Sequence, residues 1–216
     1  MRSRETAVLL MLLTLAGHLC AVVLQQQAPS ANASKDDPVS IGLVIDNSTS
    51  MKDKRNATVA ALREFVQASN PKDEFFVVNF NEDVHLDQDF TIDVSRVYKA
   101  LDQADAHGGT ALYDALLASR DHLKKGSKYT KKFLVVITDG SDNTSHVTSS
   151  NVLKEFNVAN SPIVYCVGLF REESDARGHT VLEKLAKETG GSAFFSDKSK
   201  KLEEIMIKIA GEIRNQ

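Results

Sequence analysis

Short, unbroken apolar segments alternate along this chain with segments in which apolar residues recur at every third or fourth position. The unbroken segments are rich in Val, Ile and Phe, and their apolar residues do not alternate with polar ones. This is typical of strands that are buried on both faces of a sheet. The predicted strands cover residues 41–45, 75–80, 133–137, 163–167 and 192–195.

The intervening segments have the spacing of amphipathic helices. Each has one apolar stripe on an otherwise charged surface, as in Val59, Leu62, Phe65 and Val66. Two further stripes of this kind begin at Leu112 and Leu202, and weaker helical patterns cover residues 94–104, 149–160 and 179–189.

Strands that alternate with helices are joined by right-handed crossovers. The sequence therefore predicts an α/β fold with a doubly wound, mostly parallel sheet and helices on both faces. The short segment 83–86 follows the second strand closely and predicts one short antiparallel edge strand.

The first residues have a different character from the rest. Arg2 and Arg4 precede an apolar run over residues 7–16, and small residues follow at Ala31 and Ala33. This order predicts a signal peptide over residues 1–33, and the alternative is an uncleaved N-terminal membrane anchor. We expect a polar lead-in at 34–37 and a single domain at 38–216, in a secreted, periplasmic or other extracytoplasmic protein.

The charge balance argues against two classes of partner. The chain has 26 basic and 29 acidic residues, a net charge of −3, so no overall field attracts nucleic acid or an anionic membrane surface to the domain. The predicted domain contains one cysteine, Cys166, which lies in an apolar segment and is expected to be a small buried side chain.

Oxygen-bearing side chains stand where the predicted topology brings three loops to one edge of the sheet. Asp46, Ser48 and Ser50 follow the first strand, Asp139 follows the strand at 133–137, and Thr110 precedes a helix. In open α/β sheets, ligands bind beyond the carboxyl ends of the strands, where the strand order reverses. These five residues are therefore candidates for one site.

Each loop also has a simpler interpretation when it is taken alone. Ser50 is a candidate N-cap for a helix that starts directly after it, Asp139-Gly140 is a common turn sequence, and Thr110 is a candidate N-cap for the helix that follows. Together, however, the three loops supply two carboxylates and three hydroxyls, with no soft ligand among them. Hard cations prefer this set, so we expect one ion of Mg²⁺, or of Mn²⁺ or Ca²⁺. His107, Asp142 and His146 are candidates for the rim of this site.

The chain lacks common signatures of catalysis and nucleotide binding. The loop after the first strand has neither the glycines of a dinucleotide loop nor the Gly-Lys-Ser/Thr of a P-loop. Ser48 stands where an Asp-x-Asp phosphotransfer motif would need its second acid, and there is no Gly-x-Ser-x-Gly nucleophile elbow. We therefore do not expect an enzyme.

The same residues resemble the metal-ion-dependent adhesion site (MIDAS) of von Willebrand factor type A (VWA) domains, shared with integrin inserted domains. The resemblance rests on Asp46-x-Ser48-x-Ser50, Thr110 and Asp139 in that order, with the surrounding segments Leu43–Met51, Gly108–Asp114 and Val136–Gly140. It extends over about residues 38–215. Thr49 stands where the family usually carries Gly.

The resemblance implies a Rossmann-like fold and a role for each site residue. Ser48, Ser50 and Thr110 would contact the metal directly or through one water, and Asp46 and Asp139 would act mostly through bound waters. Neutral hydroxyls leave most of the ion's charge uncompensated, so a vacant coordination position suits an Asp or Glu side chain of a protein ligand. The function implied is cation-dependent protein–protein interaction or adhesion. The alternatives are a scaffold with a purely structural or vestigial metal site and, less favoured, a metal-assisted hydrolase.

Overall fold

The computed structural model describes residues 36–103, 105–170 and 175–216. The predicted signal peptide or anchor at 1–33 lies outside the described residues, as do the first two residues of the lead-in. The described residues from Asp36 onward fall within one compact unit. None of the helices in these residues has the length and apolar character needed to span a bilayer.

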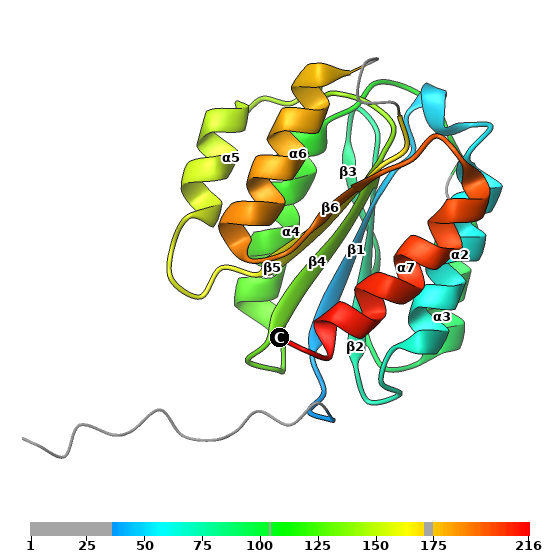
Figure 1. Cartoon of the computed structure of the whole chain (residues 1–216), viewed down its shortest axis with the longest axis vertical. Coiled ribbons are helices and arrows are strands. Elements are labelled where there is room, and N and C mark those ends of the chain that lie inside the picture. The colour runs from blue at the N-terminus through cyan, green and yellow to red at the C-terminus, as the bar shows by residue number, and fades with distance from the viewer. Residues whose placement is uncertain (1–35, 104, 171–174) are drawn as a thin grey trace, which may run out of the picture. The chain divides into compact units, whose positions relative to one another are not determined.

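A six-stranded sheet with the order β3-β2-β1-β4-β5-β6 runs through the domain. Five strands, all except β3, are parallel to one another, and β3 pairs with β2 in the antiparallel direction. The winding direction reverses between β1 and β4, which lie next to each other in the middle of the sheet (Figure 1). The strands are β1 (Ser40–Asp46), β2 (Glu74–Phe80), β3 (Val84–Thr91), β4 (Lys132–Thr138), β5 (Ile163–Gly168) and β6 (Ala193–Phe195).

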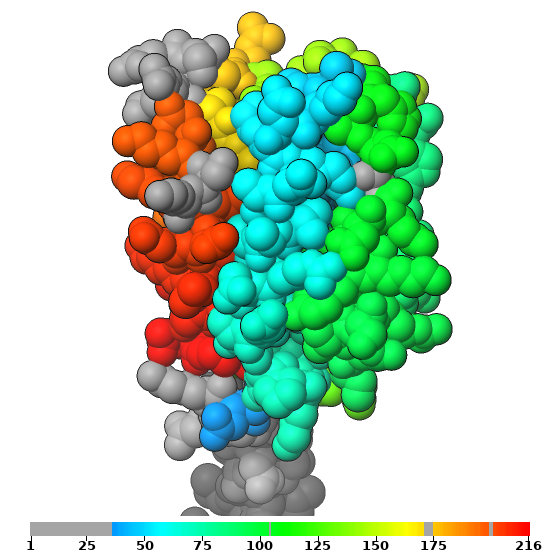
Figure 2. Space-filling model, turned by 90° about the vertical axis from the view of Figure 1, so that its right-hand side faces the viewer, coloured from blue at the N-terminus to red at the C-terminus, as the bar shows by residue number. Residues whose placement is uncertain are grey.

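Helices cover both faces of the sheet, as the alternating pattern predicts. Helices α2 (Arg55–Ala68), α3 (Val94–Gln103) and α7 (Ser199–Ile213) pack on one face, and Figure 2 shows them together on that side of the molecule. The other face carries α4 (Leu112–Gly126), α5 (Ser149–Phe156) and α6 (Ala176–Thr189). The predicted fold class is therefore confirmed.

The central strands supply both hydrophobic cores. In β1, Ile41, Leu43 and Ile45 belong to the core beneath α2 and α7, whereas Val44 belongs to the core beneath α4 and α6. Successive side chains of a strand point to opposite faces, so a strand between two cores needs apolar residues throughout. Cys166 is fully buried in the second core, as expected, and burial raises the pKa of its thiol.

The start of one helix and the length of the edge strand differ from expectation. The helix expected directly after Ser50 begins at Arg55, and only a single 3-10 turn, η1 (Thr49–Met51), comes before it. The antiparallel edge strand predicted at 83–86 is present as β3, but it has eight residues. Its full length was not predicted, because most of its side chains are exposed and do not form an apolar run.

Candidate metal-binding site at the carboxyl edge of the sheet

The candidate site lies where β1 and β4 end side by side. Asp46 is the last residue of β1, and Asp139 follows Thr138, the last residue of β4. Because these strands flank the reversal of the sheet order, the loops that leave them diverge to opposite faces and open a position for a ligand between them.

Asp46 is fully buried at the base of the site. Its Oδ1 accepts a hydrogen bond from the backbone N–H of Ser48 at 2.7 Å, and its Oδ2 accepts one from the Thr138 hydroxyl at 2.6 Å. Burial raises the pKa of the Asp46 carboxyl, although both hydrogen bonds act in the opposite direction by favouring the carboxylate. Asp46 therefore anchors the start of the β1 loop to the end of β4.

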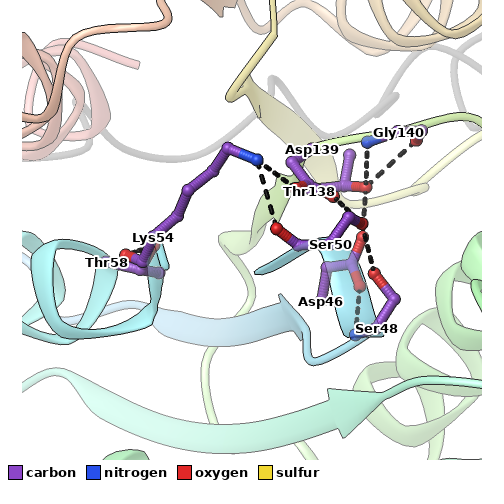
Figure 3. Close-up of polar contacts among 8 residues, drawn as sticks. All are labelled: Asp46, Ser48, Ser50, Lys54, Thr58, Thr138, Asp139 and Gly140. Atoms are coloured by element: carbon purple, nitrogen blue, oxygen red, sulfur yellow. Dashed lines mark hydrogen bonds and ion pairs between the residues drawn. The ribbon is translucent and has the colours of Figure 1, made fainter. Parts of the chain in front are cut away.

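A line of contacts connects the hydroxyls above Asp46 to the second carboxylate (Figure 3). The Oγ atoms of Ser48 and Ser50 are 3.1 Å apart, and Ser50 Oγ donates to Asp139 Oδ1 at 2.7 Å. Lys54 Nζ forms an ion pair with Asp139 Oδ2. Four of the five predicted ligands, Asp46, Ser48, Ser50 and Asp139, are thus brought together.

The loop that carries Thr110 is bonded to the β1 loop. The backbone N–H and the hydroxyl of Thr49 both donate to the Gly108 carbonyl, at 3.2 and 3.1 Å, and His107 N–H donates to the Asn47 carbonyl at 2.9 Å. Thr110 lies two residues beyond this contact, and its side chain is buried. It is not a helix cap, because the N-cap position of α4 is Ala111.

The Thr110 loop depends on a glycine at one position. Gly108 has φ +74°, and a Cβ there would lie 1.3 Å from Glu82 Oε2. Glu82 accepts a hydrogen bond from the Gly109 N–H at 2.8 Å, so its carboxylate occupies that space. Only glycine combines this backbone conformation with so close an approach.

The three predicted rim residues are engaged in other contacts. Asp142 accepts a hydrogen bond from the Tyr113 N–H at 3.0 Å and another from Ser145, and His146 bonds Asp114 through Nδ1 at 2.9 Å. These contacts fasten the first turn of α4 to the loop after β4. His107 lies close to the β1 loop, and its Nε2 is 2.9 Å from Asn81 Nδ2.

The sequence interpretation missed the roles of Thr138 and Lys54. Thr138 was not singled out in the sequence, yet its hydroxyl contacts Asp46 and also Gly140, with its Oγ1 3.1 Å from the Gly140 carbonyl. Lys54 stands four residues after Ser50, a spacing that puts both side chains on one side of a helical turn. That spacing was the available signal, but it does not indicate which carboxylate the ammonium reaches.

The donor set fits a hard divalent cation. Its atoms are carboxylate and hydroxyl oxygens, the two carboxylates are buried, and an ammonium group already pairs with one of them. In the part of the chain that the structure describes, no group of three or more His, Cys, Asp or Glu side chains could hold a metal. A site built here would therefore depend on the serine and threonine hydroxyls as well as on the carboxylates.

Comparison with known proteins identifies relatives of this fold. Residues 41–141 match the family model of the von Willebrand factor type A domain. No curated protein sequence matches the chain.

Several solved structures have the same fold at low sequence identity. The von Willebrand factor type A protein from Catenulispora acidiphila has a TM-score of 0.69 and 17% identity, covering 83% of this chain and 43% of that one. The conserved hypothetical protein BatB from Bacteroides thetaiotaomicron has a TM-score of 0.67 and 16% identity, covering 82% of this chain and all of that one. The vWF domain of the type V pili tip protein Mfa5 from Porphyromonas gingivalis has a TM-score of 0.61 and 13% identity, covering 82% and 96%.

Proposed function

We propose that this chain, which has the fold of von Willebrand factor type A domains and matches their family model over residues 41–141, binds a protein ligand through a divalent cation. The ligand would contribute an Asp or Glu side chain, and Mg²⁺ is the expected ion, with Mn²⁺ or Ca²⁺ as substitutes. The observation that carries the proposal is the contact line from Ser48 through Ser50 to Asp139 at the carboxyl edge of the sheet.

The chemistry of this contact line explains why an acidic partner would bind. The ion supplies a strong positive charge that a carboxylate can coordinate. Ser48, Ser50 and Thr110 are neutral, and the two carboxylates already accept hydrogen bonds from the protein, Asp46 from Ser48 and Thr138 and Asp139 from Ser50. The charge of a bound ion would therefore be compensated only in part, and a ligand carboxylate would complete the compensation in a partly dehydrated site.

We propose a binding protein rather than an enzyme, located outside the cytoplasm. The position two residues after Asp46 is Ser48, so the loop lacks the second acid of a phosphotransfer site. The location is proposed from the signal-like order of residues 1–33. The Mfa5 relative is described as a pili tip protein, which agrees with such a location.

Metal binding can be tested first, by calorimetry with Mg²⁺ and Mn²⁺ on the wild-type chain and on Asp139→Asn. We expect the wild type to bind one ion and Asp139→Asn to lose at least about tenfold in affinity, because it removes a buried charge from the cage. Asp53→Asn is the matched control, since Asp53 is exposed, lies in the loop after β1 that also carries Ser48 and Ser50, and loses the same charge. Equal affinities for the wild type and Asp139→Asn would refute the site.

Partner binding separates an adhesion site from a purely structural ion. A random peptide library can be panned on the wild-type chain in Mg²⁺ and eluted with a chelator. We expect the eluted peptides to be enriched in Asp and Glu, and panning on Asp139→Asn to retain none of them. If Mg²⁺ raises thermal stability but no peptide depends on it, the ion is structural and the adhesion proposal is wrong.

A further inference from the structure

Lys54 places a positive charge of the protein itself inside the candidate site. It follows the 3-10 turn that carries Ser50 and occupies the N-cap position of α2. Its Nζ pairs with Asp139 Oδ2 and donates to the Ser50 carbonyl oxygen at 3.2 Å (Figure 3). The Asp139 side chain is 1% exposed, whereas that of Lys54 is 39% exposed. The ammonium thus covers a buried carboxylate from the solvent side.

The Lys54 ammonium and a divalent cation would compete for the Asp139 carboxylate. Asp46 and Asp139 together carry two negative charges, and Lys54 compensates one of them. A divalent ion next to Asp139 would be attracted by the carboxylate and repelled by the ammonium. At distances of a few ångströms in a partly buried site, solvent and salt screen this repulsion only in part.

We propose that Lys54 is an internal cation that competes with the divalent ion for Asp139 and thereby lowers the metal affinity of the site. The inference rests on the proposed function, because it assumes that the ion binds there. Without metal, the ammonium neutralises Asp139 and holds the cluster together. When metal binds, the ammonium leaves the carboxylate and moves to solvent.

The anchoring of Lys54 allows this exchange without refolding. Its backbone N–H donates to the Met51 carbonyl at 2.9 Å, and its carbonyl accepts from the Thr58 N–H and hydroxyl at 2.9 and 3.1 Å. The start of α2 is therefore fixed through the backbone, while the four-carbon side chain is free to rotate. Asp139 keeps its hydrogen bond from Ser50 when the ammonium leaves.

The consequence is a site whose occupancy follows the surrounding metal concentration. Lys54 keeps the buried carboxylate compensated when metal is scarce, so the loops do not need the ion in order to stay together. The ion binds only where its concentration is high enough to displace the Lys54 ammonium from Asp139.

Calorimetry on three variants tests the competition. Lys54→Gln should tighten Mg²⁺ and Mn²⁺ binding by about tenfold or more, because the repulsion is removed. Lys54→Arg keeps the charge and should bind no more tightly than the wild type. Lys52→Gln is the matched control, since Lys52 is exposed, lies two residues away and loses the same charge; its affinity should stay within about twofold of wild type, as expected for an exposed charge.

The outcomes separate this inference from the proposed function. If Lys54→Gln and Lys52→Gln change the affinity equally while all proteins bind metal, the competition is wrong and the metal site stands. If no protein binds Mg²⁺ or Mn²⁺, both proposals are wrong. Far-UV circular dichroism establishes that each variant is folded.

A measurement on the wild-type chain avoids dependence on any variant. Amine acylation followed by mass spectrometry reports how accessible each lysine is. We expect Mg²⁺ to increase the acylation of Lys54 while Lys52 stays unchanged. Constant acylation of Lys54 at saturating metal would overturn the competition.

Discussion

The Thr138 hydroxyl donates a hydrogen bond to Asp46 Oδ2 at 2.6 Å and joins the last residues of two neighbouring strands, β4 and β1. Both side chains are fully buried, so no water replaces this bond. Since the other oxygen of Asp46 accepts the Ser48 N–H, the carboxylate has one fixed orientation. The base of the candidate site is therefore set by the sheet itself and not by the loops alone.

Replacing Thr138 by Val should lower the free energy of unfolding by about 1–3 kcal/mol, because it leaves a buried carboxylate oxygen without its donor. Thr138→Ser keeps the hydroxyl and loses only a methyl group, so it should be distinctly more stable than Thr138→Val. Urea unfolding of the three proteins measures the difference. Equal stability of the two variants would mean that the hydroxyl contributes nothing.

Gly108→Ala should destabilise the loop that carries Thr110. The substitution forces a residue with a Cβ into φ +74° and against the Glu82 carboxylate, at a cost of about 1–2 kcal/mol for the backbone alone. Gly211→Ala is a useful contrast, since Gly211 lies inside α7 with nothing near its added Cβ. It should instead stabilise the domain by about 0.5–1 kcal/mol. Thermal unfolding measures both effects. If the two substitutions shifted the unfolding temperature in the same direction, the strain expected for a side chain at position 108 would be wrong.

The Cys166 thiol should be unreactive in the folded protein. It lies in β5 and is fully buried in the second core, and burial raises its pKa, so the thiolate is scarce at neutral pH. An aromatic disulfide reagent should modify it only after urea unfolding. Because the full sequence also contains Cys20, mass spectrometry must locate the label, and rapid modification of Cys166 itself in the native protein would show that this part of the core opens.

Asp73 should make stability depend on pH. Burial raises the pKa of its carboxyl, although it accepts the Val39 N–H at 2.9 Å and pairs with Arg214 at 3.1 Å. The native state then holds this proton more tightly than the unfolded chain does. The contribution of Asp73 to the free energy of unfolding therefore falls as pH rises from the ordinary pKa through the raised one.

The comparison with Asp73→Asn isolates this effect. The variant cannot titrate at this position, so the stability of the wild type relative to it should decrease as the pH rises from below the ordinary pKa of an Asp carboxyl to neutral pH. Urea unfolding at several pH values measures the difference. An increase over this range would mean that the pairing with Arg214, and not burial, dominates the pKa.

The sequence was most informative about the buried strands. Residues 133–137 were predicted as a strand from their unbroken apolar character, and the strand runs from Lys132 to Thr138. The pattern works because a strand covered on both faces excludes polar residues over its whole length. The strand β3 was only partly predicted, because it lies at the edge of the sheet and its side chains are mostly exposed.

The candidate site was predicted as a set of residues but not as a set of contacts. The positions of Asp46, Ser48, Ser50 and Asp139 followed from strand ends and topology, and the structure brings these four together. The Lys54–Asp139 pair joins residues 85 positions apart, and it depends on where α2 begins. A local pattern that placed this helix directly after Ser50 could not reveal the pair.

The reversal of the winding direction between β1 and β4 divides the proposed ligands between the two halves of the chain. Ser48 and Ser50 come from the half that folds β1 to β3, and Asp139 comes from the half that folds β4 to β6. Neither half alone could offer a complete cage. A bound ion would thus find all its ligands only in the fully folded domain. Its binding energy would favour that domain over every partly folded form.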